Sequence, residues 1–174
     1  MDLILSDFHP YDTSYSRATR GASPNPGPPI FIAKTGHFTG RKHVSIEHLE
    51  EGAIIAEIDV HFSLFGNSDT VIIRGRELRI VDHSMGWTSV EFIAADGRVY
   101  KWELDSIFGR DMDLEVEGRQ VAIYDGGSRH LFSDNESPVL RIFPEVLHVL
   151  EDIVSTLAYA TKRRELHKEA SRAH

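Results

Sequence analysis

The amino-acid sequence contains no cysteine, which excludes disulfide bonds, thiolate metal sites and cysteine nucleophiles and favours a reducing compartment. It also lacks any uninterrupted apolar run of about 18 residues, so we expect no membrane-spanning helix. Basic residues are outnumbered, with 19 Lys and Arg against 27 Asp and Glu. The resulting net charge of −8 argues against nucleic acid as a partner.

Signals for targeting and for cofactor chemistry are missing as well. The segment from Met1 to Asp7 has no basic region ahead of a long apolar one, so we expect no secretory signal and a cytoplasmic protein. The sequence has no Gly-x-Gly-x-x-Gly or phosphate-binding-loop pattern, no Gly-x-Ser-x-Gly and no His-Glu-x-x-His. These absences predict no cofactor, no bound metal and no catalytic residues.

Between residues 30 and 143 the sequence consists of short β-like runs separated by turn residues. An Asp96-Gly97 pair between two such runs is typical of a β-hairpin. Roughly ten runs in a chain long enough for one domain predict a mainly β (α+β) protein, either an antiparallel barrel or a sandwich. The clearest run alternates with period two and predicts a buried face formed by Ile54, Ala56, Ile58, Val60, Phe62 and Leu64.

The two ends of the chain differ from this β pattern. Five of the seven prolines lie between residues 10 and 30, so we expect residues 1–29 to form one short strand at Leu3-Ile4-Leu5 and then a long Pro/Gly-rich loop. Residues 30–166 are the predicted barrel domain, and residues 167–174 are a charged tail.

A helix is predicted over residues 144–166, starting at Pro144, because the apolar period changes to that of a helix. Nine apolar residues, Ile153 and Leu157 among them, cover about half of its circumference. Such a wide apolar surface needs an enclosing partner, and the preceding strands are the available one. The other half is predicted to carry His148, Glu151, Asp152, Ser155, Thr156 and Tyr159.

Two segments are more specific than the general β pattern. They are the run from Asp96 to Trp102, which reads Asp-Gly-Arg-Val-Tyr-Lys-Trp, and the stretch from Leu150 to Tyr159 that is followed by Lys-Arg-Arg. Over about residues 50–166 the chain resembles a fungal domain family of unknown function in the tubby C-terminal-like superfamily, with its LURP-one-like and scramblase-like members.

The resemblance implies a closed antiparallel barrel, here of roughly ten to twelve strands, wrapped around the hydrophobic C-terminal helix. Tubby domains bind phosphoinositide headgroups through Lys and Arg on the barrel surface. That is the function the resemblance implies, without assigning it to particular positions of this chain.

Arg74, Arg76 and Arg79 surround Gly75 and form the first candidate site. Guanidinium groups bind phosphate through paired N–H donors, so the three residues are candidates for binding an anionic ligand. Within one continuous strand Arg74 and Arg76 would share a face and Arg79 would lie opposite, whereas a turn at Gly75 would change this. The alternative is ordinary surface arginines that pair with carboxylates.

The second candidate site is the basic run Lys162, Arg163 and Arg164. These side chains are candidates for contact with anionic lipid at a membrane surface, where each is worth about 1 kcal/mol. The alternative is that they complement the dipole at the C-terminal end of the helix.

Two sequence patterns contain potential metal ligands, and we interpret neither as a metal site. His37, His43 and His48 are separated by six and five residues, which matches no standard metal site, and we interpret them as exposed loop histidines. Alternating carboxylates would share one strand face and could hold Ca²⁺, but a solvated face is the favoured interpretation of Asp111, Asp113, Glu115 and Glu117.

Tyr100 and Trp102 share a predicted strand face with Leu104, and we interpret them as core residues rather than as a ligand platform. The sequence as a whole predicts a non-catalytic β-barrel binding module. Its expected ligand is an anionic lipid headgroup or a protein partner. The alternative is a small-molecule enzyme with a His/carboxylate pocket at the barrel mouth.

Overall fold

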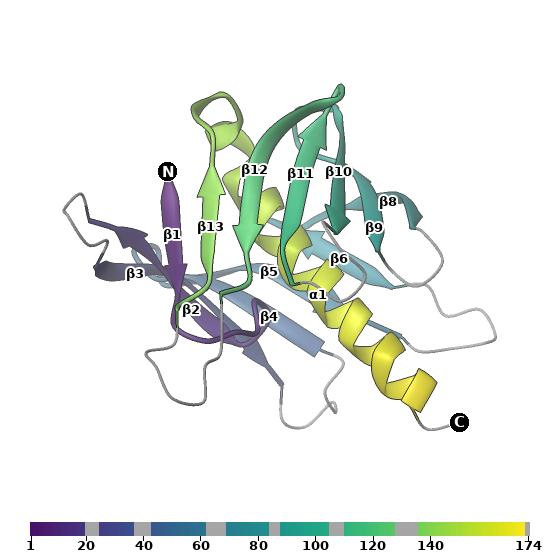
Figure 1. Cartoon of the computed structure of the whole chain (residues 1–174), viewed down its shortest axis with the longest axis horizontal. Helices are drawn as coiled ribbons and strands as arrows, with labels where there is room; N and C mark the ends of the chain where they lie inside the picture. Colours follow the sequence, from purple (N-terminus) through teal and green to yellow (C-terminus); the bar gives the residue numbers. More distant parts are fainter. Residues whose placement is uncertain are drawn as a thin grey trace.

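In the computed structural model, one long helix runs through a barrel of antiparallel strands (Figure 1). The structure describes residues 1–19, 25–36, 43–61, 69–83, 88–104, 110–127 and 136–172. The strands are β1 (Asp2–Leu5), β2 (Thr13–Ala18), β3 (Pro26–Thr35), β4 (His43–His48), β5 (Ala53–Asp59), β6 (Thr70–Ile73), β7 (Arg76–Glu77), β8 (Arg79–His83), β9 (Ser89–Ile93), β10 (Val99–Leu104), β11 (Met112–Val116), β12 (Arg119–Asp125) and β13 (Val139–Ile142).

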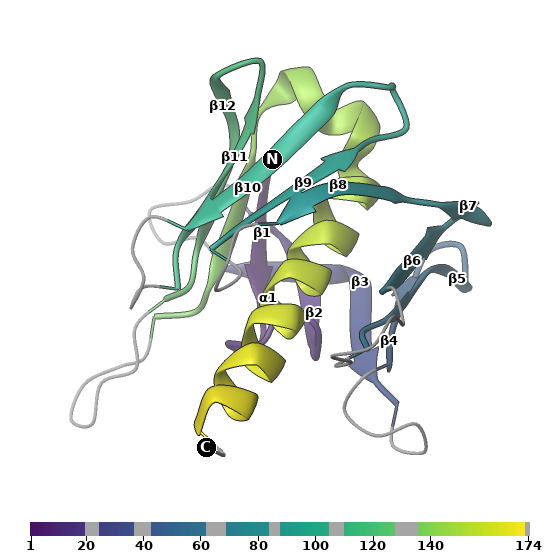
Figure 2. The same ribbon diagram turned by 90° about the vertical axis from the view of Figure 1, so that its right-hand side faces the viewer.

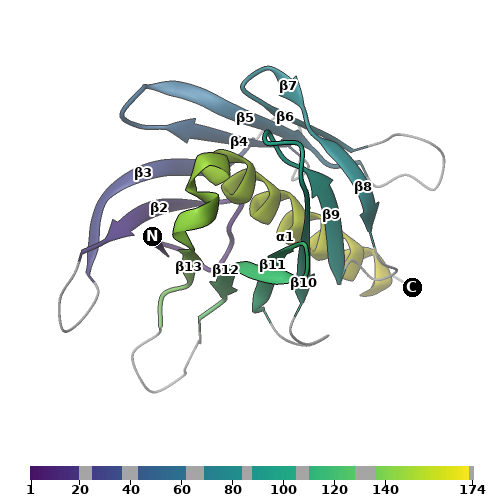
Figure 3. The same cartoon turned by 90° about the horizontal axis from the view of Figure 1, so that it is seen from above.

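All these strands form one 13-stranded sheet in the order β7-β6-β5-β4-β3-β2-β1-β13-β12-β11-β10-β9-β8. Its two edges, β7 and β8, are consecutive in the chain and separated by Leu78 alone, so the sheet nearly closes on itself. The barrel-plus-helix prediction is confirmed, with more strands than the ten to twelve expected. Figure 3 shows the strands arranged all round the helix.

The predicted N-terminal loop is wrong in part, because β2 lies within it and β3 begins in it. The prolines fit into β3 because its pairing with β2 is interrupted twice, between Tyr15 and Ser16 and between Ser16 and Ala18. Proline lacks the N–H that a regular ladder requires and is tolerated at such irregularities. Composition therefore indicated a loop where the tertiary structure accommodates an irregular strand.

The alternating run in β5 also departs from the prediction at its start. Ile54 is 60% exposed, whereas Ile55 beside it is buried. A β-bulge causes the change, since the pairing with β4 shifts by one residue between Ile46 and Glu47. Ala56, Ile58 and Val60 face the core as predicted, and Phe62 and Leu64 lie outside the described residues.

The C-terminal helix consists of a 3₁₀ segment, η1 (Pro144–Val149), and α1 (Leu150–Arg172). Its end is six residues beyond the predicted one, so the helix includes most of the expected tail. Figure 2 shows α1 running through the barrel, with its C-terminal end leaving at the bottom. Among the described residues no helix is long and apolar enough to cross a membrane.

The barrel buries more of the helix than the apolar half of its surface predicted. Ile153 and Leu157 are fully buried, as expected, but every residue from Asp152 to Ala160 is buried. The barrel therefore also encloses most of the polar half, including Ser155 and Thr156, because strands surround the helix, whereas His148 is exposed. Tyr100 and Trp102 are fully buried, which confirms their prediction as core residues.

Candidate functional site

Two pockets lie at opposite ends of α1. The first, which we call the helix-start pocket, has a volume of about 340 Å³ and is lined by residues that include Phe31, His48, Ile73, Arg76, Leu147 and Asp152. The second, which we call the cationic pocket, has a volume of about 320 Å³ and is lined by residues that include Arg110, Arg164, Glu165, Lys168, Glu169 and Arg172.

Three of the four cations in the cationic pocket come from one stripe of α1. Arg164, Lys168 and Arg172 follow one another at intervals of four residues, which places them on one face of the helix. The fourth, Arg110, comes from the segment before β11, and its guanidinium lies 5.6 Å from the centre of the Phe8 ring. Residues far apart in the chain thus bring their positive charge to one place.

The electrostatics of these cations are mutually unfavourable. Burial, and after it the positive charge of Arg110, lowers the pKa of Arg164, which is only 9% exposed. Burial likewise lowers the pKa of Lys168, and Arg164, Arg172 and Arg110 lower it further. Like charges at this spacing on a helix destabilise it, so an anion bound among them would relieve the repulsion.

Glu165, one of the two carboxylates in the cationic pocket, is engaged by its neighbours. Lys162 Nζ donates to Glu165 Oε2 at 2.7 Å, and Lys162 also lies 4.3 Å from the centre of the Tyr11 ring. Burial raises the pKa of Glu165, but the hydrogen bonds from Lys162 and Tyr11 outweigh this effect and lower the pKa. Four cations against two carboxylates leave the pocket lining positive, in a chain whose net charge is −8.

An arginine clasp forms the rim of the helix-start pocket. Arg74 lies in the turn between β6 and β7, and its guanidinium binds both Glu51 and Glu151, with hydrogen bonds of 2.8 Å and 2.7 Å from Nη2. The backbone of Arg74 has φ +52°, a left-handed conformation that is unusual for a non-glycine residue. This turn holds the guanidinium between the β4–β5 turn and the start of α1.

Below the clasp, Asp152 is 3% exposed and is fully engaged. Its Oδ1 accepts from Arg76 Nη2 at 2.6 Å, and its Oδ2 accepts from the backbone N–H of Ala95 at 2.6 Å. Burial raises the pKa of Asp152 even though both of these partners oppose the rise. The carboxylate joins three elements: the helix, the β6–β7 hairpin and the β9–β10 turn.

Asp96 in the β9–β10 turn collects hydrogen bonds beside this pocket. Its Oδ2 accepts from Arg98 Nε at 2.7 Å and from the Tyr100 hydroxyl at 2.9 Å, and lies 3.0 Å from His148 Nε2. Burial raises the pKa of Asp96, but the hydrogen bond from the Arg98 backbone N–H and these side-chain partners outweigh it and hold the pKa well below its usual range. A carboxylate with so low a pKa is a poor acceptor of a proton from a substrate.

The predicted arginine site is not assembled as expected. Gly75, with φ +75°, marks a turn, so Arg74 and Arg76 belong to a hairpin rather than to one strand face. Both have carboxylate partners, and Arg79 is exposed on β8. Arg74 and Arg76 therefore pair with nearby acids, as the alternative predicted.

The predicted basic patch also requires correction. Lys162 is 1% exposed and Arg164 is 9% exposed, so these two side chains do not form an outward-facing patch. Arg163 Nη1 donates to the His61 carbonyl at 2.6 Å, and its Nε lies 3.2 Å from Asp69. The reason is that this part of α1 is still enclosed by the barrel. Of the three residues, Arg164 alone lines the cationic pocket.

Among the described residues, the histidines and the alternating carboxylates form no group that could hold a metal ion. The prediction of exposed loop histidines is wrong for His43 and His48, which are the half-buried first and last residues of β4, and His37 lies outside the described residues. His43 Nδ1 is 2.7 Å from Asp59, and His48 lines the helix-start pocket. Along β11 the carboxylates of Asp113 and Glu115 alternate with buried apolar side chains, as the pattern predicted.

Most of the cationic pocket was missed from the sequence. The interval of four between Arg164, Lys168 and Arg172 was a usable signal for one stripe, once the helix is known to continue to Arg172. Nothing in the local sequence of Arg110 indicates that it joins this stripe. Its placement depends on how the segment before β11 packs beside the end of the helix.

Fold and pockets together define a one-domain antiparallel β-barrel protein with an enclosed C-terminal helix and a positively charged pocket at the end of that helix. The chain belongs to the family of unknown function DUF6593, whose profile matches residues 13–166. A search of curated proteins and a search of solved structures found no match.

Proposed function

We propose that this protein is a non-catalytic binding module that holds an anionic ligand in the cationic pocket. The observation that carries the proposal is the convergence of Arg110 with the stripe of Arg164, Lys168 and Arg172 on one pocket of an acidic protein. Arginine presents a planar fork of N–H donors that suits phosphate, and lysine adds a mobile point charge.

The headgroup of an anionic lipid is the ligand class that we favour. Lys168 and Arg172 are exposed at the end of α1, where each would contribute about 1 kcal/mol to attraction toward an anionic membrane surface. A free phosphate compound offers the same chemistry, and an acidic segment of a partner protein is the alternative.

The proposal also includes membership of the tubby C-terminal-like superfamily and a cytoplasmic location. The enclosed helix supports the superfamily membership.

Vesicle sedimentation at low salt tests the proposal. We expect the protein to sediment with phosphatidylcholine vesicles that contain phosphatidylserine and not with pure phosphatidylcholine. The double substitution Lys168→Ala and Arg172→Ala should weaken binding by about 2 kcal/mol, or about 30-fold. Inorganic pyrophosphate, followed by calorimetry, is the second arm. Binding of pyrophosphate without binding of vesicles would identify a soluble anion as the ligand source.

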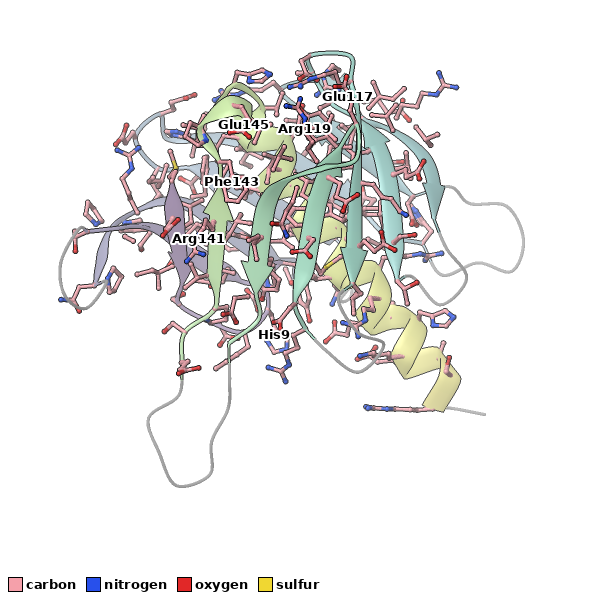
Figure 4. The ribbon with its side chains drawn as sticks, turned by 45° about the horizontal axis from the view of Figure 1, so that its top comes forward. His9, Glu117, Arg119, Arg141, Phe143 and Glu145 are labelled. Atoms are coloured by element: carbon pink, nitrogen blue, oxygen red, sulfur yellow. The ribbon has the colours of Figure 1, made fainter. Side chains whose placement is uncertain are left out.

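A matched control removes the same charge elsewhere. Arg119 and Arg141 are both exposed on the barrel wall, and Figure 4 shows both away from His9, which lines the cationic pocket. The double substitution Arg119→Ala and Arg141→Ala should leave binding within about twofold of wild type. Binding of neither probe, or equal losses in both double variants, would refute an anion site in the cationic pocket.

The enzyme alternative has one observation in its favour, which is the His148–Asp96 pair beside the helix-start pocket. However, Asp96 already accepts from Arg98 and Tyr100, and its lowered pKa makes it a weak base. His148 is 51% exposed, so its ring is open to solvent rather than held in a closed site. These features favour a structural role for the pair and binding as the function.

A further inference from the structure

We propose that the cationic pocket selects a dianionic phosphate monoester, and that the Tyr124 hydroxyl donates a hydrogen bond to one of its terminal oxygens. This inference rests on the proposed function, because it names the class of anion that the same pocket holds. It adds to the four cations a specificity-determining residue that carries no charge.

Tyr124 reaches the cationic pocket from inside the barrel. It lines the pocket and is 2% exposed. Its neighbours across the sheet, Met112 on β11 and Leu140 on β13, are core residues. Paired residues on adjacent strands point to the same face of a sheet, so the Tyr124 side chain also points into the barrel.

The hydroxyl of Tyr124 differs from those of the other four tyrosines in the chain. Each of these has an acceptor: Tyr15 donates to the Pro10 carbonyl, Tyr100 to Asp96, Tyr159 to Asp69, and Tyr11 to Glu165. Among the described residues the Tyr124 hydroxyl has no hydrogen-bond partner. Unlike the fully enclosed, unpartnered nitrogen of His48, this oxygen keeps accessible surface where Tyr124 lines the pocket. Buried polar groups are normally hydrogen-bonded, so the hydroxyl indicates a place for a ligand atom.

This hydroxyl is a neutral donor close to a cation. Burial raises the pKa of Tyr124, and the positive charge of Arg110 offsets only part of the rise. The phenol therefore keeps its proton, so it donates a hydrogen bond and adds no negative charge that would repel an anion. The effect of Arg110 on the hydroxyl places the two groups near the same part of the pocket, where one anion can contact both.

The charge of the pocket lining favours two negative charges over one. Within the described ranges, Arg110, Lys168 and Arg172 have no carboxylate partner. Of the two carboxylates in the pocket, Glu165 is already paired with Lys162. A phosphate monoester carries a charge of about −1.5 to −2 at neutral pH, whereas a phosphate diester or a carboxylate carries a single negative charge. The monoester therefore offsets more of the repulsion among the cations.

The number of terminal oxygens favours the same class. The fork of one arginine can hold two oxygens of a phosphate group. A monoester presents three terminal oxygens, so one remains for the Tyr124 hydroxyl. A diester presents only two, and the guanidinium of Arg110 can occupy both. Charge and hydrogen bonding thus select the monoester together.

NMR titration of the full chain at pH 7.5 tests the selection with three probes. Methyl phosphate has three terminal oxygens and nearly two charges, methyl sulfate has three oxygens and one charge, and dimethyl phosphate has two oxygens and one charge. We expect methyl phosphate to bind about tenfold or more tightly than dimethyl phosphate, with methyl sulfate between them.

Two outcomes would overturn this inference and leave the proposed function standing. The first is equal binding of methyl phosphate and dimethyl phosphate. The second is binding of none of the three probes by a protein that still sediments with phosphatidylserine vesicles. If vesicles, pyrophosphate and all three probes fail to bind, the proposed function falls with the inference.

Tyr124→Phe removes the hydroxyl and keeps the ring. It should weaken methyl phosphate binding about tenfold and leave dimethyl phosphate binding within about twofold of wild type. Because the hydroxyl has no partner in the described chain, thermal stability should not fall. The control is Tyr100→Phe, which loses its bond to Asp96 beside the helix-start pocket and should lower stability without changing the selectivity. Unchanged selectivity in Tyr124→Phe would overturn the role of its hydroxyl.

Vesicles identify the source of the monoester. Phosphatidic acid carries its phosphate as a monoester, whereas phosphatidylserine carries a diester. Tighter sedimentation with phosphatidic acid than with phosphatidylserine at equal mole fraction, lost in Tyr124→Phe, would assign a lipid headgroup. Selectivity for methyl phosphate without this vesicle preference would assign a soluble phosphate monoester.

Discussion

The indole N–H of Trp102 donates to the hydroxyl oxygen of Thr156 at 2.9 Å, in the middle of the barrel, and both residues are fully buried. Trp102 belongs to β10 and Thr156 to α1, so the bond joins the wall of the barrel to the enclosed helix. Thr156 in turn donates to the Asp152 carbonyl at 2.7 Å. The buried indole N–H of Trp102 and the hydroxyl of Thr156 are thereby both hydrogen-bonded inside a mainly apolar core.

Thr156→Val should destabilise the protein by about 1–3 kcal/mol, because the shape is kept while the buried Trp102 N–H loses its acceptor. Urea unfolding gives the free energy. The control is Thr161→Val. The Thr161 hydroxyl also donates to a helix carbonyl, that of Leu157, so the control removes the same kind of bond without touching Trp102. Its cost should stay below about 0.5 kcal/mol. Equal costs for the two variants would contradict a stabilising role for the Trp102 bond.

Asp96→Asn should change the acid side of the stability profile. The pKa of Asp96 is lowered in the folded protein, so its carboxylate stabilises the fold above the unfolded-state pKa of about 3.9 and this contribution is lost as the pH falls below it. The advantage of wild type over Asp96→Asn should therefore shrink on acidification. Thermal unfolding at a series of pH values measures it.

Asp152→Asn is the matched comparison, because its effect on stability should depend on pH in the opposite direction. The pKa of Asp152 is raised by burial, so between its unfolded-state and folded-state values the folded protein binds more protons. Wild type should gain stability relative to Asp152→Asn as the pH falls through that window. Parallel slopes for the two variants would contradict the assigned environments of the two carboxylates.

Glu165→Gln should destabilise the protein by about 1–3 kcal/mol, because Lys162 is buried and would lose its ionic partner. Adding Lys162→Met should recover much of this loss, since an apolar side chain of similar length needs no counter-charge. Glu103→Gln, at an exposed Lys101–Glu103 pair, serves as the control and should cost about 0.5 kcal/mol or less. An additive double variant would show that Lys162 and Glu165 are not coupled.

Gly126→Ala should reduce anion binding without touching a charged side chain. A Cβ at Gly126 would collide with the Cβ and backbone of Arg110, so Arg110 would have to move away from the cationic pocket. Gly118→Ala is the control, because its Cβ meets nothing within 4 Å although its positive φ costs about 1 kcal/mol of stability. We expect weaker sedimentation with phosphatidylserine vesicles for Gly126→Ala alone; normal binding by that variant would argue against a role for Arg110.

Local signals predicted the elements well where one residue type decides the conformation. The Asp96-Gly97 pair forms the expected hairpin, with Gly97 at φ +81°, because glycine accepts positive φ readily. Ile153 and Leu157 predicted burial of the helix from periodicity alone. Proline content misled at β3, because composition does not show where a strand pairing is interrupted.

The charged groups were the least predictable part. Lys162, Arg163 and Arg164 look equivalent in sequence, yet one pairs with Glu165, one with Asp69, and one lines the cationic pocket. A long charged side chain orients toward the nearest partner of opposite charge, and for Arg163 that partner comes from a distant part of the chain. Burial of a charge depends on the surrounding fold, which no local pattern records.

The sequence by itself determined a mainly β domain with one over-apolar C-terminal helix, since both follow from residue-by-residue periodicity. Only the tertiary structure decided which cations meet at the end of that helix, and which other cations along the helix pair with carboxylates. The physical reason is range: hydrophobic periodicity acts between near neighbours in the chain. The charge of a pocket is the sum over residues such as Arg110 and Arg172, which are brought together only when the barrel closes round the helix.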